Sequence, residues 1–183
     1  MRKISSDLQP MGYATFFQRM HAYFVDLLVF IPITSLANYN ILHFKHFGIV
    51  VLTTLVWIIY KPVMEWKFGA TLGKMVAKVR VVNERMEFPS FNQAMLRFSP
   101  YFAISLSTIL SYYGLFNLEA FATITTMEEL NELAPLIPSD AVAASYVFFM
   151  ASITFFFFDP KKQCLHDKYS QTYCIKVQPT TSK

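Results

Sequence analysis

The chain has 183 residues, of which 54% are hydrophobic and only 15% are charged. An average soluble domain carries about 25% charged residues, and a short chain has much surface to cover with polar groups, so the composition argues against a soluble globular protein. The net charge of +4 fits either nucleic acid or an anionic membrane surface. Because the basic residues border apolar segments, we expect lipid headgroups as partners and no nucleic acid.

Four apolar windows are long enough, or nearly so, to cross about 30 Å of hydrocarbon as helices. They run over residues 21–36, 47–64, 98–118 and 141–158. Tyr and Trp residues lie near several of their ends, as is common at membrane interfaces. The sequence therefore predicts an all-α membrane protein with four transmembrane helices, organised as one domain over residues 1–183.

Basic residues are distributed unevenly in and beside the connecting segments. All but one of the 16 Lys and Arg residues lie in or close beside the N-terminal arm, the segment between the second and third windows, or the C-terminal tail; the exception is Lys45. Lys and Arg concentrate on the cytoplasmic side of membrane proteins. Both termini are therefore predicted to be cytoplasmic, with an even number of spans between them.

The segment 117–140, between the third and fourth windows, is acidic and contains no Lys or Arg. It is predicted to lie outside the cytoplasm. Within it, the spacing of Thr126 and Glu129 is typical of a capping box that opens a short helix, and Pro135 is expected to end that helix.

The cytoplasmic segments are predicted to form a small platform. Lys74 and Lys78 lie one helical turn apart, which suits a short basic helix in the anionic headgroup layer. Val79–Val82 and Thr172–Val177 have strand-like patterns, and we predict that they pair with each other. Residues 178–183 are predicted to be disordered.

Asp26 lies inside the first predicted span. A carboxylate there costs at least about 2.5 kcal/mol to place, so it normally faces protein or water and has a partner. Arg19 lies two helical turns earlier on the same face, within reach of its long side chain. Two interpretations stay open: a functional polar site at the cytoplasmic end of the bundle, or an internal ion pair that fixes helix packing.

The segment Gly69-Ala-Thr71-Leu-Gly73-Lys74 has some likeness to a phosphate-binding loop. The P-loop needs four residues between its glycines and Ser or Thr after the Lys, whereas this segment has three residues there and is followed by Met75. We interpret it instead as a cytoplasmic glycine-rich turn, in which the glycines permit positive φ or a close backbone approach.

The sequence contains no pattern typical of an enzyme, because both the GxSxG nucleophile elbow and the HExxH zinc motif are absent. Cys164 and Cys174 do not have metal-ligand spacing, and as two thiols in a cytoplasmic tail they are expected to stay reduced. We therefore predict that the protein is not an enzyme and has no cofactor and no metal.

Several segments taken together resemble the RDD family, small bacterial membrane proteins named for one arginine and two aspartates. The matching segments are Arg19–Asp26, Glu65, Gly69–Lys74, Val79–Val82, Arg97 and Gln163–Asp167. They follow one another in the family's order over most of the chain. The acidic segment 117–140 lies outside the pattern and is interpreted as an insertion.

The resemblance implies that Arg19, Asp26 and Asp167 are the naming residues and that the protein resides in the bacterial cytoplasmic (inner) membrane. The sequence alone assigns Asp167 to a solvated turn. The resemblance implies instead that Asp167 folds back to join Arg19 and Asp26, with Glu65 nearby, as a charge cluster at the cytoplasmic mouth of the bundle. The function of the family is largely undefined, although transport, including cation/proton exchange, has been proposed.

Two functional hypotheses follow. In the first, the protein is transport-related: Asp26 carries an ion or proton, Arg19 tunes its charge state, and Asp167 gates or completes the site. Four helices are few for a carrier, so this hypothesis requires a homo-oligomer, whose interface a polar ladder on the third span could supply. In the second, the protein is a non-transporting scaffold or accessory protein and its charge cluster is structural. The polar ladder consists of Ser105, Ser107, Thr108 and Ser111.

Overall fold

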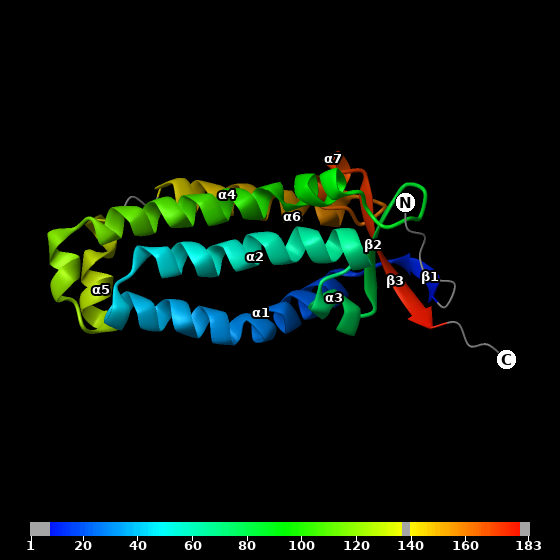
Figure 1. Ribbon diagram of the computed structural model, residues 1–183. Helices are drawn as coiled ribbons and strands as arrows, with labels where there is room; N and C mark the ends of the chain where they lie inside the picture. The colour runs from blue at the N-terminus through cyan, green and yellow to red at the C-terminus, as the bar shows by residue number, and fades with distance from the viewer. Residues whose placement is uncertain (1–7, 137–139, 180–183) are drawn as a thin grey trace.

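The computed structural model of the protein describes residues 8–136 and 140–179. Four long helices run side by side along one axis, with a small sheet across one end of the bundle and short helices at the other (Figure 1). These long helices are α1 (Phe16–Tyr39), α2 (Phe47–Phe68), α4 (Phe91–Phe116) and α6 (Asp140–Phe158). Each predicted window thus corresponds to one long helix.

Three segments are long and apolar enough to cross a membrane, namely Phe16–Phe44, Phe47–Phe68 and Asp140–Phe158. The first joins α1 to the π-helical turn Asn40–Phe44. The predicted span over residues 98–118 is not confirmed, because α4 has 26 residues but does not reach the same apolarity. The reason is that α4 packs against both α2 and α6 and turns polar side chains inward, including Arg97.

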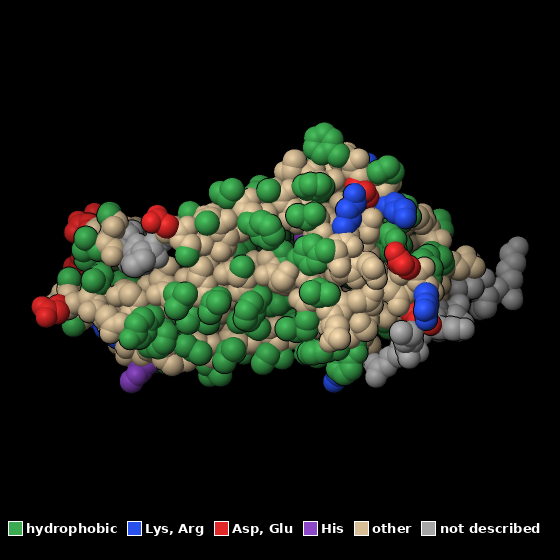
Figure 2. All heavy atoms as spheres, turned by 90° about the horizontal axis from the view of Figure 1, so that it is seen from above, with side chains coloured by type: hydrophobic (Ala, Val, Ile, Leu, Met, Phe, Trp, Pro, Cys, Tyr) green, Lys and Arg blue, Asp and Glu red, His purple; other side chains and the backbone are tan. Residues whose placement is uncertain are grey.

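The surface differs along the axis of the bundle. Hydrophobic side chains cover the middle of the visible face, whereas acidic side chains gather at one end and most visible Lys and Arg side chains at the other (Figure 2). We call the end that carries the strands the sheet end, and the opposite end, which carries the acidic segment, the loop end. An apolar belt between two charged ends is the pattern expected of helices that cross a bilayer.

The sheet contains three antiparallel strands in the order β1-β3-β2. The predicted pairing is confirmed, since β2 (Val79–Asn83) pairs with β3 (Thr172–Pro179). Strand β1 (Leu8–Tyr13) was not predicted, and it pairs with the other edge of β3. The predicted disorder is wrong for residues 178 and 179, which belong to β3 because β1 pairs with them; residues 180–183 lie outside the described residues.

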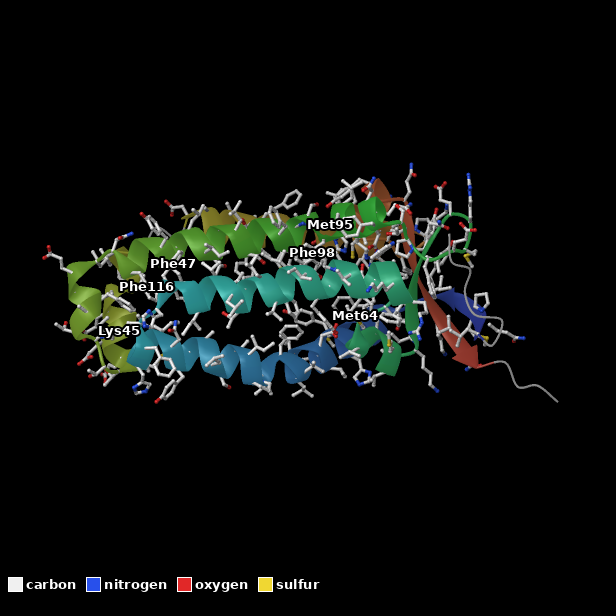
Figure 3. The ribbon with its side chains drawn as sticks, in the orientation of Figure 1. Lys45, Phe47, Met64, Met95, Phe98 and Phe116 are labelled. Carbon is white, nitrogen blue, oxygen red and sulfur yellow. The ribbon has the colours of Figure 1, made fainter. Side chains whose placement is uncertain are left out.

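The loop end is held by apolar contacts. Ile41, Leu115, Phe121 and Ile124 form a buried cluster there. Beside it, the rings of Phe47 on α2 and Phe116 on α4 are 5.7 Å apart, and Figure 3 shows both residues at this end of the bundle.

Three short helices form within the acidic segment: Glu119–Thr123, α5 (Met127–Leu133) and Ala134–Leu136. The predicted capping box is confirmed, since the Glu129 amide donates to Thr126 Oγ1 at 3.3 Å and the Glu129 carboxylate accepts from the Thr126 amide at 3.2 Å.

Two five-residue helices lie at the sheet end, α3 (Leu72–Val76) and α7 (Leu165–Tyr169). The short helix predicted near Lys74 and Lys78 therefore exists, although it ends before Lys78. The prediction that this helix places its basic residues in the anionic headgroup layer is wrong for Lys74. Its side chain is only 12% exposed and forms an ion pair with Glu65. A buried carboxylate attracts this ammonium more strongly than a solvated headgroup layer does.

Candidate functional site

Five charged side chains form one chain of ion pairs at the sheet end, which we call the ion-pair network. Arg19 Nη1 lies 2.6 Å from Asp167 Oδ2, and Asp167 Oδ1 lies 2.5 Å from Arg97 Nη1. Arg97 Nε lies 3.0 Å from Glu65 Oε2, and the other carboxylate oxygen of Glu65 pairs with Lys74. The network thereby joins α7, α1, α4, α2 and α3.

Asp167 is the centre of the network and is fully buried. It stands in the first turn of α7, where its carboxylate also accepts a hydrogen bond from the Cys164 amide at 3.2 Å. Although burial raises its pKa, the two guanidinium groups of Arg97 and Arg19 outweigh burial and hold the pKa well below its usual range. Asp167 is therefore a permanent anion at physiological pH.

His166 stands beside this carboxylate, with Nε2 3.4 Å from Asp167 Oδ1. Its other ring nitrogen, Nδ1, is hydrogen-bonded to Ser152 Oγ at 3.0 Å. Burial lowers the pKa of His166 to about 3, which the neighbouring Asp167 only partly offsets. The imidazole is therefore neutral at physiological pH.

Arg97 connects the network to the sheet. Its Nη1 donates to Thr172 Oγ1 at 2.9 Å and its Nη2 to Cys174 Sγ at 3.0 Å, both at the start of β3. Arg97 is not among the site residues predicted from the sequence. A guanidinium at the edge of an otherwise apolar window is the signal that could have identified it, because such a charge needs a buried partner.

Asp26 does not belong to the network. The predicted ion pair with Arg19 is wrong, because Arg19 turns instead to Asp167 and to the backbone carbonyl of Lys162, at 2.5 Å. The Asp26 carboxylate accepts three hydrogen bonds, from Thr71 Oγ1 at 2.6 Å, the Gly73 amide at 2.8 Å and Tyr60 Oη at 2.9 Å. Asp26 thus binds α3 and its glycine-rich turn to α1.

The glycine-rich turn has the features that its glycines predict. Gly69 ends α2 with a φ of 64°, the left-handed conformation that glycine adopts without strain. At Gly73 the approach is so close that an added Cβ would lie 1.9 Å from the Ala22 carbonyl oxygen. Thr71 caps α3 by accepting a hydrogen bond from the Lys74 amide at 3.3 Å. The motif is therefore an adaptor that fits α3 against α1 and delivers two donors to Asp26.

A cavity of about 240 Å³ lies beside the network, between α1, α2, α4 and α6. Much of its wall is apolar, and Figure 3 shows one of its residues, Phe98, on α4 in the half of the bundle nearer the sheet. Four cations and two carboxylates also line it: Arg19, Lys61, Lys74 and Arg97, with Asp26 and Glu65.

Lys61 differs from the other charged residues of this cavity. It is 9% exposed, and within the described part of the chain its ammonium forms no ion pair and no hydrogen bond. Its Nζ lies 3.2 Å from the centre of the Tyr101 ring, a cation–π contact. Lys61 is not among the site residues predicted from the sequence, although a lysine inside the second apolar window is a signal that could have identified it.

A second cavity, of about 360 Å³, continues toward the loop end. It shares Tyr23, Tyr101 and Phe149 with the first cavity, so the two adjoin at these aromatic side chains. Five Ser and Thr side chains line the second cavity: Thr34, Thr53, Thr54, Ser105 and Thr108.

The polar ladder of α4 is directed into the chain at two of its positions. Ser105 and Ser107 are buried, and Ser107 Oγ lies 3.3 Å from Ser145 Oγ on α6. These two serines are therefore not available for the predicted interface between subunits, because contacts within the chain already cover them.

Cys164, His166 and Asp167 bring one thiol, imidazole and carboxylate ligand atom each within 4.8 Å of one another. They do not fit a metal ion as they stand. Asp167 is held by two arginines, and burial, the largest cause, raises the pKa of the Cys164 thiol to about 12, so the thiolate that metals prefer is disfavoured.

These features define a small helical protein whose described residues include three helical segments long and apolar enough to cross a membrane, with a charged cavity at one end of the bundle. The model of the RDD family matches residues 13–171, and the chain belongs to this family. Comparison with curated proteins and with solved structures finds no match.

Proposed function

We propose that this protein is a transport-related protein of the bacterial cytoplasmic membrane, and that the interior of its bundle is a route for a small cation or for protons. The sheet end and both termini lie in the cytoplasm in this proposal. The unequal distribution of Lys and Arg among the connecting segments supports this orientation. All four long helices cross the bilayer, α4 with its polar residues turned inward.

The observation that carries the proposal is the pair of adjoining cavities. The first begins among charged side chains at the sheet end, and the second continues between the helices with hydroxyl oxygens in its wall. Oxygen ligands are those that small hard cations prefer, and polar groups facing the interior of a membrane bundle commonly mark ion or proton pathways. Tyr23, Tyr101 and Phe149, shared by both cavities, are in the position of a gate.

The roles of the charged residues differ in this proposal from those that the sequence suggested. Asp26 is a positioning residue rather than the carrier, since its carboxylate is occupied by three hydrogen bonds from Tyr60, Thr71 and Gly73. Arg19 and Asp167 hold α1 to α7. The hydroxyl groups of the second cavity take the transported ion or the water that conducts protons.

Collapse of a pH gradient in everted membrane vesicles tests the proposal. The vesicles are energised, NaCl or KCl is added, and the gradient is followed with a fluorescent weak base. We expect wild type to dissipate the gradient with at least one salt, and Thr108→Val, which removes a hydroxyl from the second cavity, to dissipate it several-fold more slowly.

The matched control is Thr154→Val on α6, an exposed threonine that lines neither cavity. It is expected to behave like wild type at equal expression. If wild-type vesicles behave like vesicles without the protein for both salts, cation/proton exchange is wrong.

The second candidate function is a non-transporting scaffold or accessory protein. The ion-pair network favours it, because Arg19, Asp167, Arg97, Glu65 and Lys74 are all paired with one another, as in a structural cluster. The two functions differ in whether water reaches the second cavity, which only a transport route needs.

A further inference from the structure

Lys61 is an ammonium without a matching anion in a cavity that is otherwise balanced. Arg19, Lys74 and Arg97 each pair with Asp167 or Glu65. Asp26, the remaining carboxylate of the wall, is taken by donors from Tyr60, Thr71 and Gly73. The fourth cation, Lys61, is left with the face of the Tyr101 ring.

The charges of the site leave one positive charge in excess. Four cations, Arg19, Lys61, Lys74 and Arg97, stand against the three carboxylates of Asp26, Glu65 and Asp167. Burying a charge without a counter-ion is costly, and a cation–π contact recovers only about 0.5–2 kcal/mol of that cost. The cavity therefore suits a ligand that carries a single negative charge.

Arg19 supplies a second cationic donor that lacks an acceptor. Arg19 lines the cavity and its Nε is buried without a hydrogen-bond partner, although both of its terminal nitrogens are engaged. Buried N–H groups are nearly always hydrogen-bonded, and the two residues with cationic donors that lack an acceptor, Arg19 and Lys61, line the same cavity, which indicates an anionic ligand there.

The rest of the wall is apolar. Phe16 and Met20 of α1 and Phe149, Ile153 and Phe156 of α6 line the cavity, and the rings of Phe16 and Phe156 pack together with their centroids 6.0 Å apart. A ligand that fills this space therefore has a hydrocarbon part beside its anionic group, which excludes a simple inorganic anion as the best fit.

The cavity opens on the side where α1 and α6 face each other. The main packing partners of α1 are α2 and α3, whereas α6 packs on α4 and α7. Two lining residues of α1, Met20 and Tyr23, are 42% and 44% exposed, and Tyr146 of α6, which lines the second cavity, is 52% exposed. In a bilayer this opening faces lipid rather than water.

From these observations we propose that the cavity binds the phosphate of a membrane phospholipid, with the phosphodiester between Lys61 and Arg19 and an acyl chain along the apolar wall. The phosphodiester carries one negative charge, and the lipid enters from the bilayer between α1 and α6. The proposal rests on the proposed function only in placing the bundle across a membrane. A bound lipid neutralises Lys61 and so removes a charge that repels cations from the route.

Binding of phosphatidylglycerol to the purified full-length protein tests the proposal. The lipid is titrated in detergent and bound molecules are counted by native mass spectrometry. We expect Lys61→Met to weaken binding at least tenfold and Lys67→Met to leave it unchanged. Lys67 is the matched control because it lies on the same helix, is exposed and does not line the cavity. Equal binding by wild type and Lys61→Met overturns the proposal.

Two further ligands identify what the site recognises. Glycerophosphoglycerol, which has the same phosphodiester as phosphatidylglycerol but no acyl chains, is expected to bind far more weakly, and equal affinity overturns the assignment to a lipid. Diacylglycerol, which has the chains but no phosphate, is also expected to bind far more weakly, and equal affinity overturns the charge argument. This binding assay does not measure transport. If the lipid binds but wild-type vesicles do not dissipate the pH gradient after salt is added, only the transport function is refuted.

Discussion

The two ends of the bundle are stabilised by different kinds of interaction. At the sheet end, buried charges are paired in series, and α1, α2, α3, α4 and α7 meet through them. At the loop end, Ile41, Leu115, Phe121 and Ile124 form an apolar cluster, and Lys45 contacts it through the ring of Phe121 rather than through an ion pair. Apolar packing is non-directional and loses stability in proportion to what is removed, whereas removal of one partner from a buried ion pair leaves another charge uncompensated.

The two ends also differ in what they offer a ligand. The apolar cluster of the loop end is filled by its own side chains. The sheet end combines the network with a cavity of about 240 Å³, and Lys61 faces that cavity without a counter-ion. The paired charges therefore hold the sheet end rigid, whereas Lys61, which has no counter-ion, is the charge that a ligand can bind.

Asp167→Asn is expected to have the largest effect. It leaves Arg19 and Arg97 buried without their shared anion, which should lower the free energy of unfolding by about 3–5 kcal/mol. Thermal unfolding in detergent, followed by tryptophan fluorescence, measures the loss. Glu132 at the loop end is exposed, so Glu132→Gln is the control and should leave the unfolding temperature unchanged.

Gly73→Ala should destabilise the sheet end somewhat less. Its Cβ would meet the Ala22 carbonyl oxygen at 1.9 Å and force α3 away from Asp26, at an expected cost of about 3 kcal/mol from overpacking and weakened hydrogen bonds. Gly48→Ala is the matched control, because nothing lies within 4 Å of an added Cβ there. Thermal unfolding in detergent measures both variants. If Gly73→Ala unfolds at the same temperature as Gly48→Ala, the adaptor role of the motif is refuted.

His166 should make the sheet end sensitive to mild acid. Its pKa is about 3 in the folded protein, below the ordinary value of 6.5, so the unfolded chain binds a proton first as the pH falls. Stability should therefore fall by about 2 kcal/mol between pH 7 and pH 5. The depressed pKa of Asp167 does not change stability between pH 7 and pH 5, because the stabilisation that it contributes is lost only as the pH falls below the pKa of this residue in the unfolded chain, 3.8. His166→Asn should flatten the dependence in thermal unfolding at several pH values.

Lys61→Met should have the smallest effect, and the effect should be of opposite sign. The variant replaces a buried ammonium without a counter-ion by an apolar side chain of similar length, which should raise the free energy of unfolding by about 1 kcal/mol in lipid-free detergent. A loss of stability as large as that of Asp167→Asn would show that Lys61 has a structural partner.

Much of the fold could be predicted because it depends on local patterns. Apolar windows located the four long helices, and alternation located the β2–β3 pair. Strand β1 was missed because Leu8–Tyr13 includes Pro10 and Gly12, which disfavour strands, and it forms by pairing with β3 at the far end of the chain.

The candidate site was harder to predict because its contacts are long-range. Arg19 was paired with Asp26 by helical spacing, yet its partner Asp167 is 148 residues away in sequence. The importance of Lys61 depends on which carboxylates the other cations occupy, and that is a property of the packed bundle. Sequence patterns identify charges that need partners, and packing decides which one is left over.

Water access to the second cavity is the most direct test of the central claim that the bundle interior is a polar route. Ser105 lines that cavity, whereas its neighbour on α4, Leu106, is 46% exposed on the outside of the bundle. The two variants compared are therefore Ser105→Cys and Leu106→Cys. A membrane-impermeant cationic thiol reagent is added to everted vesicles, where it meets the cytoplasmic side, with wild type as the background for the two buried native cysteines. We predict labelling of Ser105→Cys but not of Leu106→Cys; no labelling of Ser105→Cys above wild type would contradict the route.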